Sequence, residues 1–139
     1  MKQILPNIQI IAAPSNSKLF YFSRIYHSAI NRGALNLIMN SVQSIASQKK
    51  HSKGKIIIHT WHDQDNLYCT MADDGPGIPA ENRSRIFDPF FTTRMVGKGI
   101  GLGLNISYDI IVNKHKGMIS FECPETGGTV FTLRFPLKC

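Results

Sequence analysis

Glycine occupies every second position of the stretch GKGIGLGL, residues 97–104. Each glycine gives up side-chain packing and adds backbone entropy that is lost on folding, so this spacing predicts a ligand very close to the backbone. Free amides that lead into a helix N-terminus bind phosphate, and Lys98 can add a positive charge. The Walker and dinucleotide glycine patterns do not fit the stretch. The alternative is a flexible loop whose glycines only permit turns, although the intervening leucines favour a surface buried on one side.

The stretch MADDGPGIP, residues 71–79, places Asp73 at the end of a predicted strand and then turns through Gly75 and Gly77. A carboxylate at a strand end can accept a hydrogen bond from an exocyclic amine, and glycines let a flat ring approach the backbone. This combination suits a purine better than a metal ion. An ordinary Asp-Gly turn is the alternative.

Two asparagines, Asn36 and Asn40, lie four residues apart in a predicted helix, so both amides project from one face. Asparagine is mildly unfavourable inside a helix, which suggests a reason for the pair. One amide oxygen can complete the coordination shell of a Mg²⁺ ion held mainly by phosphate oxygens and water. The alternative is a pair of amides that simply face solvent.

The elements that must position these residues alternate along the chain. Helical periodicity predicts helices, and β-rich runs bounded by turn residues predict strands. The predicted helices span residues 29–50, 80–87 and 102–117, the last of them ended by Gly117. The predicted strands lie within residues 1–14 and span 55–62, 66–73, 118–123 and 129–137. This pattern indicates an α+β fold in which helices cover one face of a mostly antiparallel sheet.

The composition of the 139 residues, 42% hydrophobic and 18% charged, is typical of one soluble globular domain. A formal net charge of +7 suits a polyanionic ligand, either a nucleotide or a nucleic acid. The sequence has no recognition-helix pattern or aromatic stacking platform, which speaks against nucleic acid. Three scattered cysteines without CxxC spacing indicate reduced thiols in a cytosolic protein. The apolar stretches are too short to span a membrane.

Taken in order, the asparagine helix, DDGPGIP, IFDPFFTTR and GKGIGLGL resemble the ATP-binding domain of sensor histidine kinases. That fold is shared with gyrase B, the MutL proteins and the Hsp-type chaperone ATPases. The resemblance covers nearly the whole chain and implies a single domain over residues 1–139, a two-layer α/β sandwich (the Bergerat fold) with a mobile ATP lid. The family's segments correspond to an N box at 35–45, a G1 box at 73–79, an F box at 86–94, the lid at 88–99, a G2 box at 97–104 and a last Gly-Thr segment at 126–131.

The resemblance also implies roles for the matched residues. Asn40 takes the place of the Mg²⁺ ligand, and Asn36, Asn40 and Lys98 act in phosphoryl transfer. Asp73 accepts a hydrogen bond from the adenine amine, and Thr129 shares a water-mediated contact with the base. Phe87, Phe90 and Phe91 anchor the lid. The residues expected to bind ATP are Asn40, Asp73, Gly75, Gly77, Ile78, Phe87, Phe90, Arg94, Lys98, Gly99, Gly101, Leu102, Gly103, Leu104 and Thr129.

At position 36 the ATPase branches of this fold carry a glutamate that activates water, whereas Asn36 cannot take a proton. We therefore expect a cytoplasmic histidine kinase domain that holds Mg·ATP for transfer to a histidine on a separate dimerisation and phosphoacceptor domain. A response regulator receiver domain would act downstream, no nucleic acid partner is expected, and membrane attachment would come only through other domains. The chain would be either an excised domain or a natural short protein. The alternative is a regulatory or ATPase-type ATP-binding module without histidine kinase activity.

Overall fold

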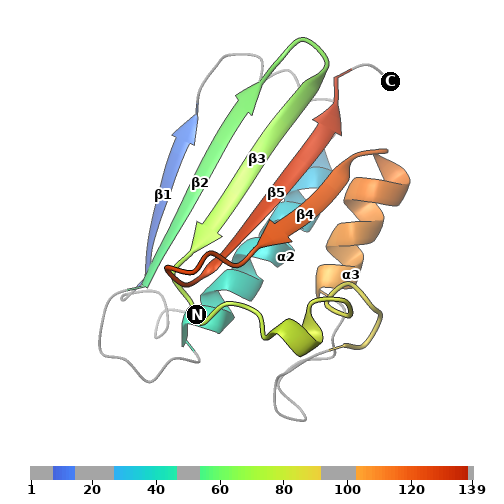
Figure 1. The fold of residues 1–139 in the computed structure, drawn as a ribbon. Helices are drawn as coiled ribbons and strands as arrows, with labels where there is room; N and C mark the ends of the chain where they lie inside the picture. Colours follow the sequence, from blue (N-terminus) through green and yellow to red (C-terminus); the bar gives the residue numbers. More distant parts are fainter. Residues whose placement is uncertain (1–7, 15–26, 47–53, 92–102, 138–139) are drawn as a thin grey trace.

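Five strands form one sheet with the order β1-β2-β3-β5-β4. The computed structural model describes residues 8–14, 27–46, 54–91 and 103–137 (Figure 1). Strands β1 and β2 are parallel, and every other neighbouring pair is antiparallel. The mostly antiparallel sheet predicted from the sequence is therefore confirmed. The strands are β1 (Ile8–Pro14), β2 (Gly54–His62), β3 (Asn66–Asp73), β4 (Met118–Glu122) and β5 (Thr129–Pro136).

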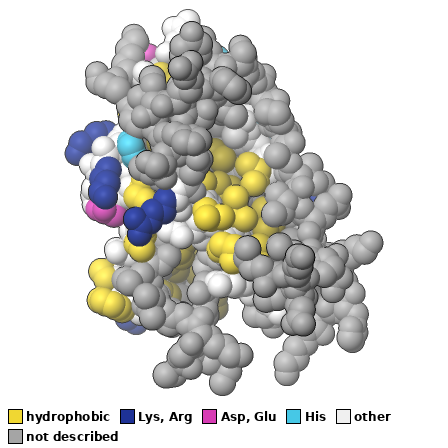
Figure 2. All heavy atoms as spheres, turned by 180° about the vertical axis from the view of Figure 1, so that it is seen from behind, with side chains coloured by type: hydrophobic (Ala, Val, Ile, Leu, Met, Phe, Trp, Pro, Cys, Tyr) yellow, Lys and Arg dark blue, Asp and Glu magenta, His cyan; other side chains and the backbone are white. Residues whose placement is uncertain are grey.

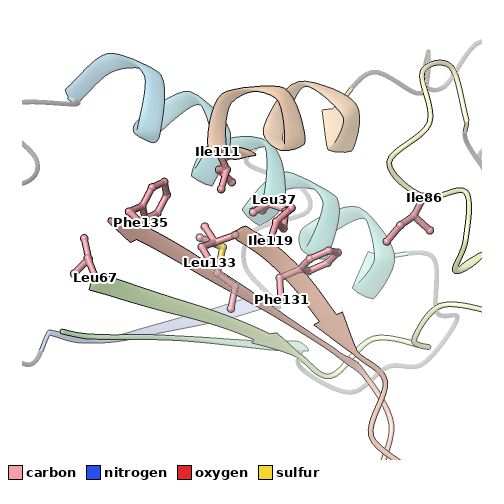
Figure 3. Packing of buried hydrophobic residues seen from close by; sticks show 9 residues of the cluster. Leu37, Leu67, Ile86, Ile111, Ile119, Phe131, Leu133 and Phe135 are labelled. Carbon is pink, nitrogen blue, oxygen red and sulfur yellow. The ribbon is translucent and has the colours of Figure 1, made fainter. Parts of the chain in front are cut away.

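The helices lie against one face of this sheet (Figures 1 and 3). The long helix α2 (His27–Ala46) is followed much later in the chain by α3 (Gly103–Tyr108), which continues as the π-helix η3 (Asp109–Lys114). Of the short helix predicted over residues 80–87, only the 3₁₀ turn η2 (Ala80–Asn82) forms. Among the described residues, no helix is both long and apolar enough to cross a membrane.

The core lies between the helix layer and the sheet (Figure 3). On β5 the buried side chains alternate with half-buried ones, as expected for a strand with one face covered. Phe131 and Leu133 from this strand meet Leu37 of α2 and Ile111 of η3 in one cluster. Burying each of these side chains contributes about 1.5–3 kcal/mol, so this layer fixes α2 against the sheet.

The opposite view shows hydrophobic side chains in the middle of the visible face and Lys and Arg side chains to one side (Figure 2). Among the described residues, the large hydrophobic side chains that are exposed come from four different elements or loops. They are Leu35, Ile57, Phe90 and Met118. Single exposed apolar residues of this kind are normal on a globular surface.

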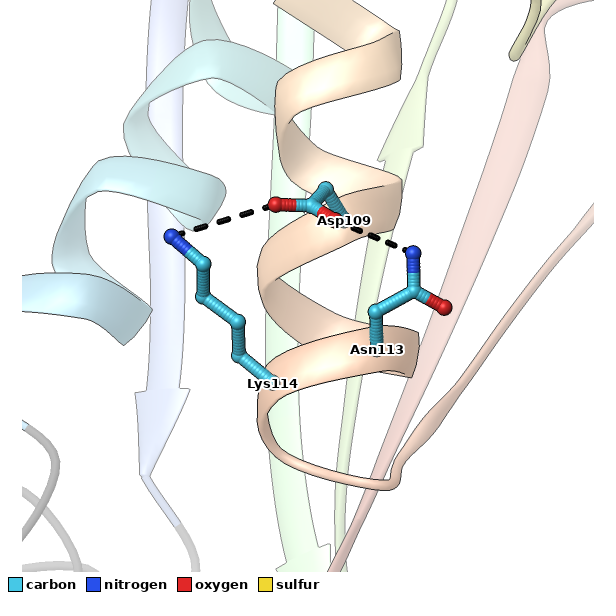
Figure 4. A network of polar contacts seen from close by, with 3 residues as sticks. All are labelled: Asp109, Asn113 and Lys114. Atoms are coloured by element: carbon cyan, nitrogen blue, oxygen red, sulfur yellow. Dashed lines mark hydrogen bonds and ion pairs between the residues drawn. The ribbon is translucent and has the colours of Figure 1, made fainter.

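The helix formed by α3 and η3 differs from the continuous α-helix predicted over residues 102–117. Its last six residues, Asp109–Lys114, form a π-helix, in which the fourth and fifth residues after Asp109 both lie beside it. Asn113 accordingly donates to Asp109 Oδ1 at 3.0 Å, and Lys114 Nζ lies 3.8 Å from Asp109 Oδ2 (Figure 4). These exposed contacts stabilise the helix end only slightly.

Gly117 follows the helix, but for a different reason from the one expected. The residue with a left-handed backbone is Lys116, with a φ of 57°, and not the glycine. A Cβ at Gly117 would collide with the carbonyl oxygen of Arg134 on β5. The glycine therefore permits close packing of the helix end on the sheet rather than an unusual backbone angle.

Candidate functional site

A buried carboxylate lies at the end of β3, where the sequence predicted it. Asp73 is 9% exposed. Its Oδ2 accepts a hydrogen bond from Ser41 Oγ of α2 at 3.1 Å, and its Oδ1 accepts one from the Gly75 backbone N–H at 2.9 Å. Burial raises the pKa of Asp73 above its ordinary value, while the hydrogen bonds from Gly75, Ser41 and the Thr129 backbone oppose that rise. The site thus holds a carboxylate whose ionisation is costly and is supported by donors from three segments.

The two glycines of the following turn are required by the protein's own packing. A Cβ on buried Gly75 would lie 2.9 Å from Ser44 Oγ and 3.0 Å from Asp73 Oδ1. Gly77 has a φ of 78°, and its Cβ would lie 3.2 Å from the Gly128 carbonyl oxygen. These glycines therefore bring the turn close to α2 and to the loop before β5.

Thr129 lies directly opposite Asp73 in the β3–β5 register and is buried. Gly128, just before it, has a φ of 81°, and a Cβ there would collide with the Asp73 carbonyl oxygen. The end of β3 and the start of β5 thus meet at the same edge of the sheet as the middle of α2. The structure brings together residues that the sequence separates by more than 80 positions, from Ser41 to Thr129.

The asparagines approach this edge from α2. Asn40 directly precedes Ser41, whose hydroxyl bonds to Asp73, and Asn36 lies about one turn earlier. Both asparagines are half-buried, so neither projects fully into solvent. Their amide oxygens are ligands of the kind that Mg²⁺ accepts. The Asp73 carboxylate and the amides of the neighbouring turn of α2 are groups of the kind that fit a purine nucleotide with its metal ion.

The F-box aromatics behave differently from one another. Phe87 is half-buried, with ring centroids 5.2 Å from Tyr108 and 6.1 Å from Phe121. Its carbonyl oxygen accepts a hydrogen bond from Asn105 Nδ2 at 3.0 Å, which ties this segment to α3. Phe91 also packs against the core.

Phe90 differs from both in its exposure, and its predicted role as an anchor of the lid stays a prediction because most of the lid lies outside the described residues. It is 73% exposed and has a left-handed backbone with a φ of 65°. Bulky residues rarely adopt this conformation, and here it lies at a turn between the packed Phe87 and Phe91. The side chain is consequently available on the surface.

The remaining candidates divide between described and undescribed residues. Ile78 is half-buried and packs against the core, and so does Leu104. Gly103 is the first residue of α3, one residue after the predicted start of this helix at residue 102. The predicted phosphate-binding residues Arg94, Lys98, Gly99, Gly101 and Leu102, and with them most of the predicted lid, lie outside the described residues.

Sequence reasoning missed Ser41 and Gly128. The Ser41–Asp73 bond joins residues 32 positions apart, and no local pattern announces such a contact. A serine within a predicted helix is a weak signal, because it is less favourable there than alanine. Gly128 lies in the predicted turn between two strands and in the predicted last Gly-Thr segment, but neither pattern indicates its close approach to Asp73.

The fold and the site together define a nucleotide-binding α/β domain. Residues 27–139 match the family described as "Histidine kinase-, DNA gyrase B-, and HSP90-like ATPase". The chain therefore belongs to this family, and the resemblance to the ATP-binding domain of sensor histidine kinases is confirmed.

Named relatives agree with this membership. The signal transduction histidine-protein kinase AtoS of Escherichia coli (strain K12) is 38% identical over 105 residues, which are 75% of this chain and 16% of AtoS. The solved catalytic domain of histidine kinase ThkA superposes with a TM-score of 0.73 at 29% identity, covering 97% of this chain and 82% of that domain. A structure of ThkA in complex with the response regulator protein TrrA matches with a TM-score of 0.66 at 26% identity, over 97% of this chain and 35% of that one. The chain thus spans about one sixth of the length of AtoS and has the fold of histidine kinase catalytic domains.

Proposed function

We propose that this chain is the Mg·ATP-binding catalytic domain of a sensor histidine kinase and transfers the γ-phosphoryl group to a histidine on a separate phosphoacceptor domain. The observation that carries the proposal is the buried Asp73, held by Ser41 and Gly75 at the edge where the asparagines of α2 also lie. Such an acceptor in a glycine-lined turn suits the amine of adenine. The proposal treats residues 1–139 as one domain.

Binding of the base depends on the ends of β3 and β5. Asp73 accepts a hydrogen bond from the adenine amine, and Thr129, opposite it in the sheet, contacts the same base. Gly75 and Gly77 let the ring approach the backbone. Because these residues are already held by the fold, little ordering is needed when the base binds.

The asparagines of α2 govern the phosphate end of the proposed site. Asn40 offers an amide oxygen to Mg²⁺, and the metal, when bound, neutralises phosphate charge and orients the γ-phosphate. Asn36 stands where a base would activate water, and an amide cannot accept a proton at ordinary pH. The chain therefore positions ATP and leaves the nucleophile to the acceptor.

In the proposed transfer, an imidazole nitrogen of the acceptor histidine forms a bond to the γ-phosphorus. The bond between that phosphorus and the β–γ bridging oxygen breaks, and ADP leaves with the electron pair. Catalysis of this kind needs mainly positioning and charge neutralisation.

The proposed partners are a histidine phosphoacceptor domain and, downstream, a response regulator. The second is supported by the solved complex of ThkA with the response regulator protein TrrA. Because ATP is the phosphoryl donor, we place the reaction in the cytoplasm.

The test mixes the purified chain with γ-labelled ATP, Mg²⁺ and a separately purified phosphoacceptor domain, such as that of AtoS. Acid-labile phosphate on the acceptor is the expected result, and the Asp73→Asn variant should give none. Binding of ATP in calorimetry without any transfer would indicate a regulatory module instead. If no adenine nucleotide binds with or without Mg²⁺, the proposed function is wrong.

A further inference from the structure

The proposed function treats the hydroxyl of Ser41 only as a support of Asp73 and gives it no part in the choice of the base. Ser41 is 1% exposed, and its Oγ lies 3.1 Å from Asp73 Oδ2. An ionised carboxylate has no proton to give, so Ser41 must be the donor. We propose that Ser41 is a positioning residue that sets the base selectivity of the site by holding Asp73 as a hydrogen-bond acceptor. This inference rests on the proposed function, because it concerns the same nucleotide site.

The acceptor capacity of Asp73 explains why one hydroxyl matters. An ionised carboxylate has about four acceptor positions. Gly75 occupies one on Oδ1 and Ser41 one on Oδ2, and the backbone of Thr129 donates to the group as well. Little capacity remains, so an incoming base can offer about one N–H. The amine of adenine meets this requirement, whereas a carbonyl oxygen at the same ring position would face a negative charge.

No cation offsets the burial of this carboxylate in the described part of the chain. Toward Asp73, α2 presents the hydroxyl of Ser41, and β5 presents Thr129. The charged group that acts on Asp73 is Asp74, which raises its pKa further and whose Oδ1 accepts from the Lys55 backbone N–H at 2.9 Å. Among the described residues, the ionised form of Asp73 is therefore favoured by neutral hydrogen-bond donors. Gly75 and Thr129 donate from the backbone, and Ser41 donates from its side chain.

Removal of the hydroxyl should change what Asp73 offers to a ligand. With fewer donors, a buried carboxylate is protonated more readily, and a protonated carboxyl group can donate to a carbonyl oxygen. The variant Ser41→Ala should therefore bind ATP more weakly and discriminate less against inosine triphosphate, which carries a carbonyl in place of the amine. Alanine is a better helix former than serine, so α2 should tolerate the change.

The experiment measures binding of ATP and of inosine triphosphate by calorimetry in the presence of Mg²⁺. The measurements are repeated at pH values from about 5.5 to about 8.5, above the ordinary pKa of an aspartate, because the pKa of Asp73 is raised. For Ser41→Ala we expect roughly ten-fold weaker ATP binding, the loss typical of a hydrogen bond to a charged group. The preference for ATP over inosine triphosphate should shrink several-fold. The loss of ATP affinity on acidification should also begin at a higher pH than in the wild type.

The control is Ser107→Ala. Ser107 of α3 is another buried serine, and its Oγ donates to the Gly33 carbonyl oxygen at 2.9 Å, away from Asp73. The Ser107→Ala variant should be less stable than the wild type but should keep the wild-type preference for ATP over inosine triphosphate. If Ser41→Ala does not fold, Ser41→Cys keeps the side-chain size with only a weak donor and should show the same reduced preference.

An unchanged ratio of the two affinities in either folded Ser41 variant would overturn the inference, even if both nucleotides bind less well. A reduced ratio in Ser41→Ala together with a wild-type ratio in Ser107→Ala supports it. Failure of the wild-type chain to bind either nucleotide would instead overturn the proposed function, so the two failures are distinguishable.

Discussion

Two adjacent glycines before β5 provide a matched pair of substitutions. Gly127 and Gly128 both have positive φ angles, 105° and 81°. A Cβ at Gly127 would meet no heavy atom within 4 Å, whereas a Cβ at Gly128 would collide with the Asp73 carbonyl oxygen and lie 3.3 Å from the Cα of Asp74. Gly127→Ala therefore tests the backbone conformation alone, and Gly128→Ala adds a collision with the end of β3.

The structure gives the expected size of the difference. Backbone strain should cost each variant about 1–3 kcal/mol. The collision at Gly128 involves backbone atoms that cannot rotate away, so Gly128→Ala should cost about a further 1–3 kcal/mol. At roughly 2–8 °C per kcal/mol, Gly128→Ala should melt well below Gly127→Ala. The collision displaces the segment that carries Asp73. The ATP affinity of Gly128→Ala should therefore also fall about ten-fold, which corresponds to the loss of one hydrogen bond to a charged group.

Thermal unfolding followed by circular dichroism gives the stability of both variants. ATP affinity is then measured by calorimetry at a temperature at which both are folded. Gly127→Ala should keep an ATP affinity close to that of the wild type. Equal melting temperatures for the two variants, or wild-type ATP affinity in Gly128→Ala, would refute the reasoning that the close contact between Gly128 and Asp73 supports both stability and ATP binding.

Three further predictions concern single side chains. Asp73→Asn should abolish ATP binding in calorimetry yet melt at a higher temperature than the wild type at neutral pH; the raised pKa makes ionisation cost stability as the pH rises above about 4, so the difference should vanish below that pH. Asn40→Ala should weaken binding of Mg·ATP more than binding of ATP with a chelator, and equal weakening would argue against a metal ligand. Cys69 is half-buried, and desolvation raises the pKa of its thiol to about 11, so at pH 8 alkylation followed by mass spectrometry should be far slower in the folded than in the unfolded protein; equal rates would contradict its half-buried position.

Local signals were enough to predict the hairpin of β2 and β3. Both strands have the predicted bounds to within one residue, because β-branched runs end at turn residues that bond locally. In the connecting turn, Asp63 Oδ1 accepts from the backbone N–H groups of Asp65 and Asn66 at 2.8 and 2.7 Å. Such Asx turns depend only on neighbours in the chain, so the sequence contains all the information that fixes them.

The features that could not be predicted depend on distant residues. The π-helix after Tyr108 leaves no local mark, and the packing of Gly117 on Arg134 becomes visible only when the sheet is assembled. The exposed Phe90 looks in the sequence like the two packed phenylalanines beside it, Phe87 and Phe91. At Gly117 and Phe90 the environment of the residue depends on packing that the neighbouring sequence does not encode.

At Asp73 the requirements of folding and of binding oppose each other. No cation lies beside this buried carboxylate among the residues that the structure describes, so its charge destabilises the domain at neutral pH, and an asparagine or an apolar residue would fill the same place at lower cost. The fold offsets part of this cost with donors from α2, from the turn and from β5, and the glycines at 75 and 128 allow those segments to come close enough. This arrangement keeps a charged hydrogen-bond acceptor at the end of β3. The proposed hydrogen bond from the adenine amine would explain why this acceptor is kept despite its cost to stability.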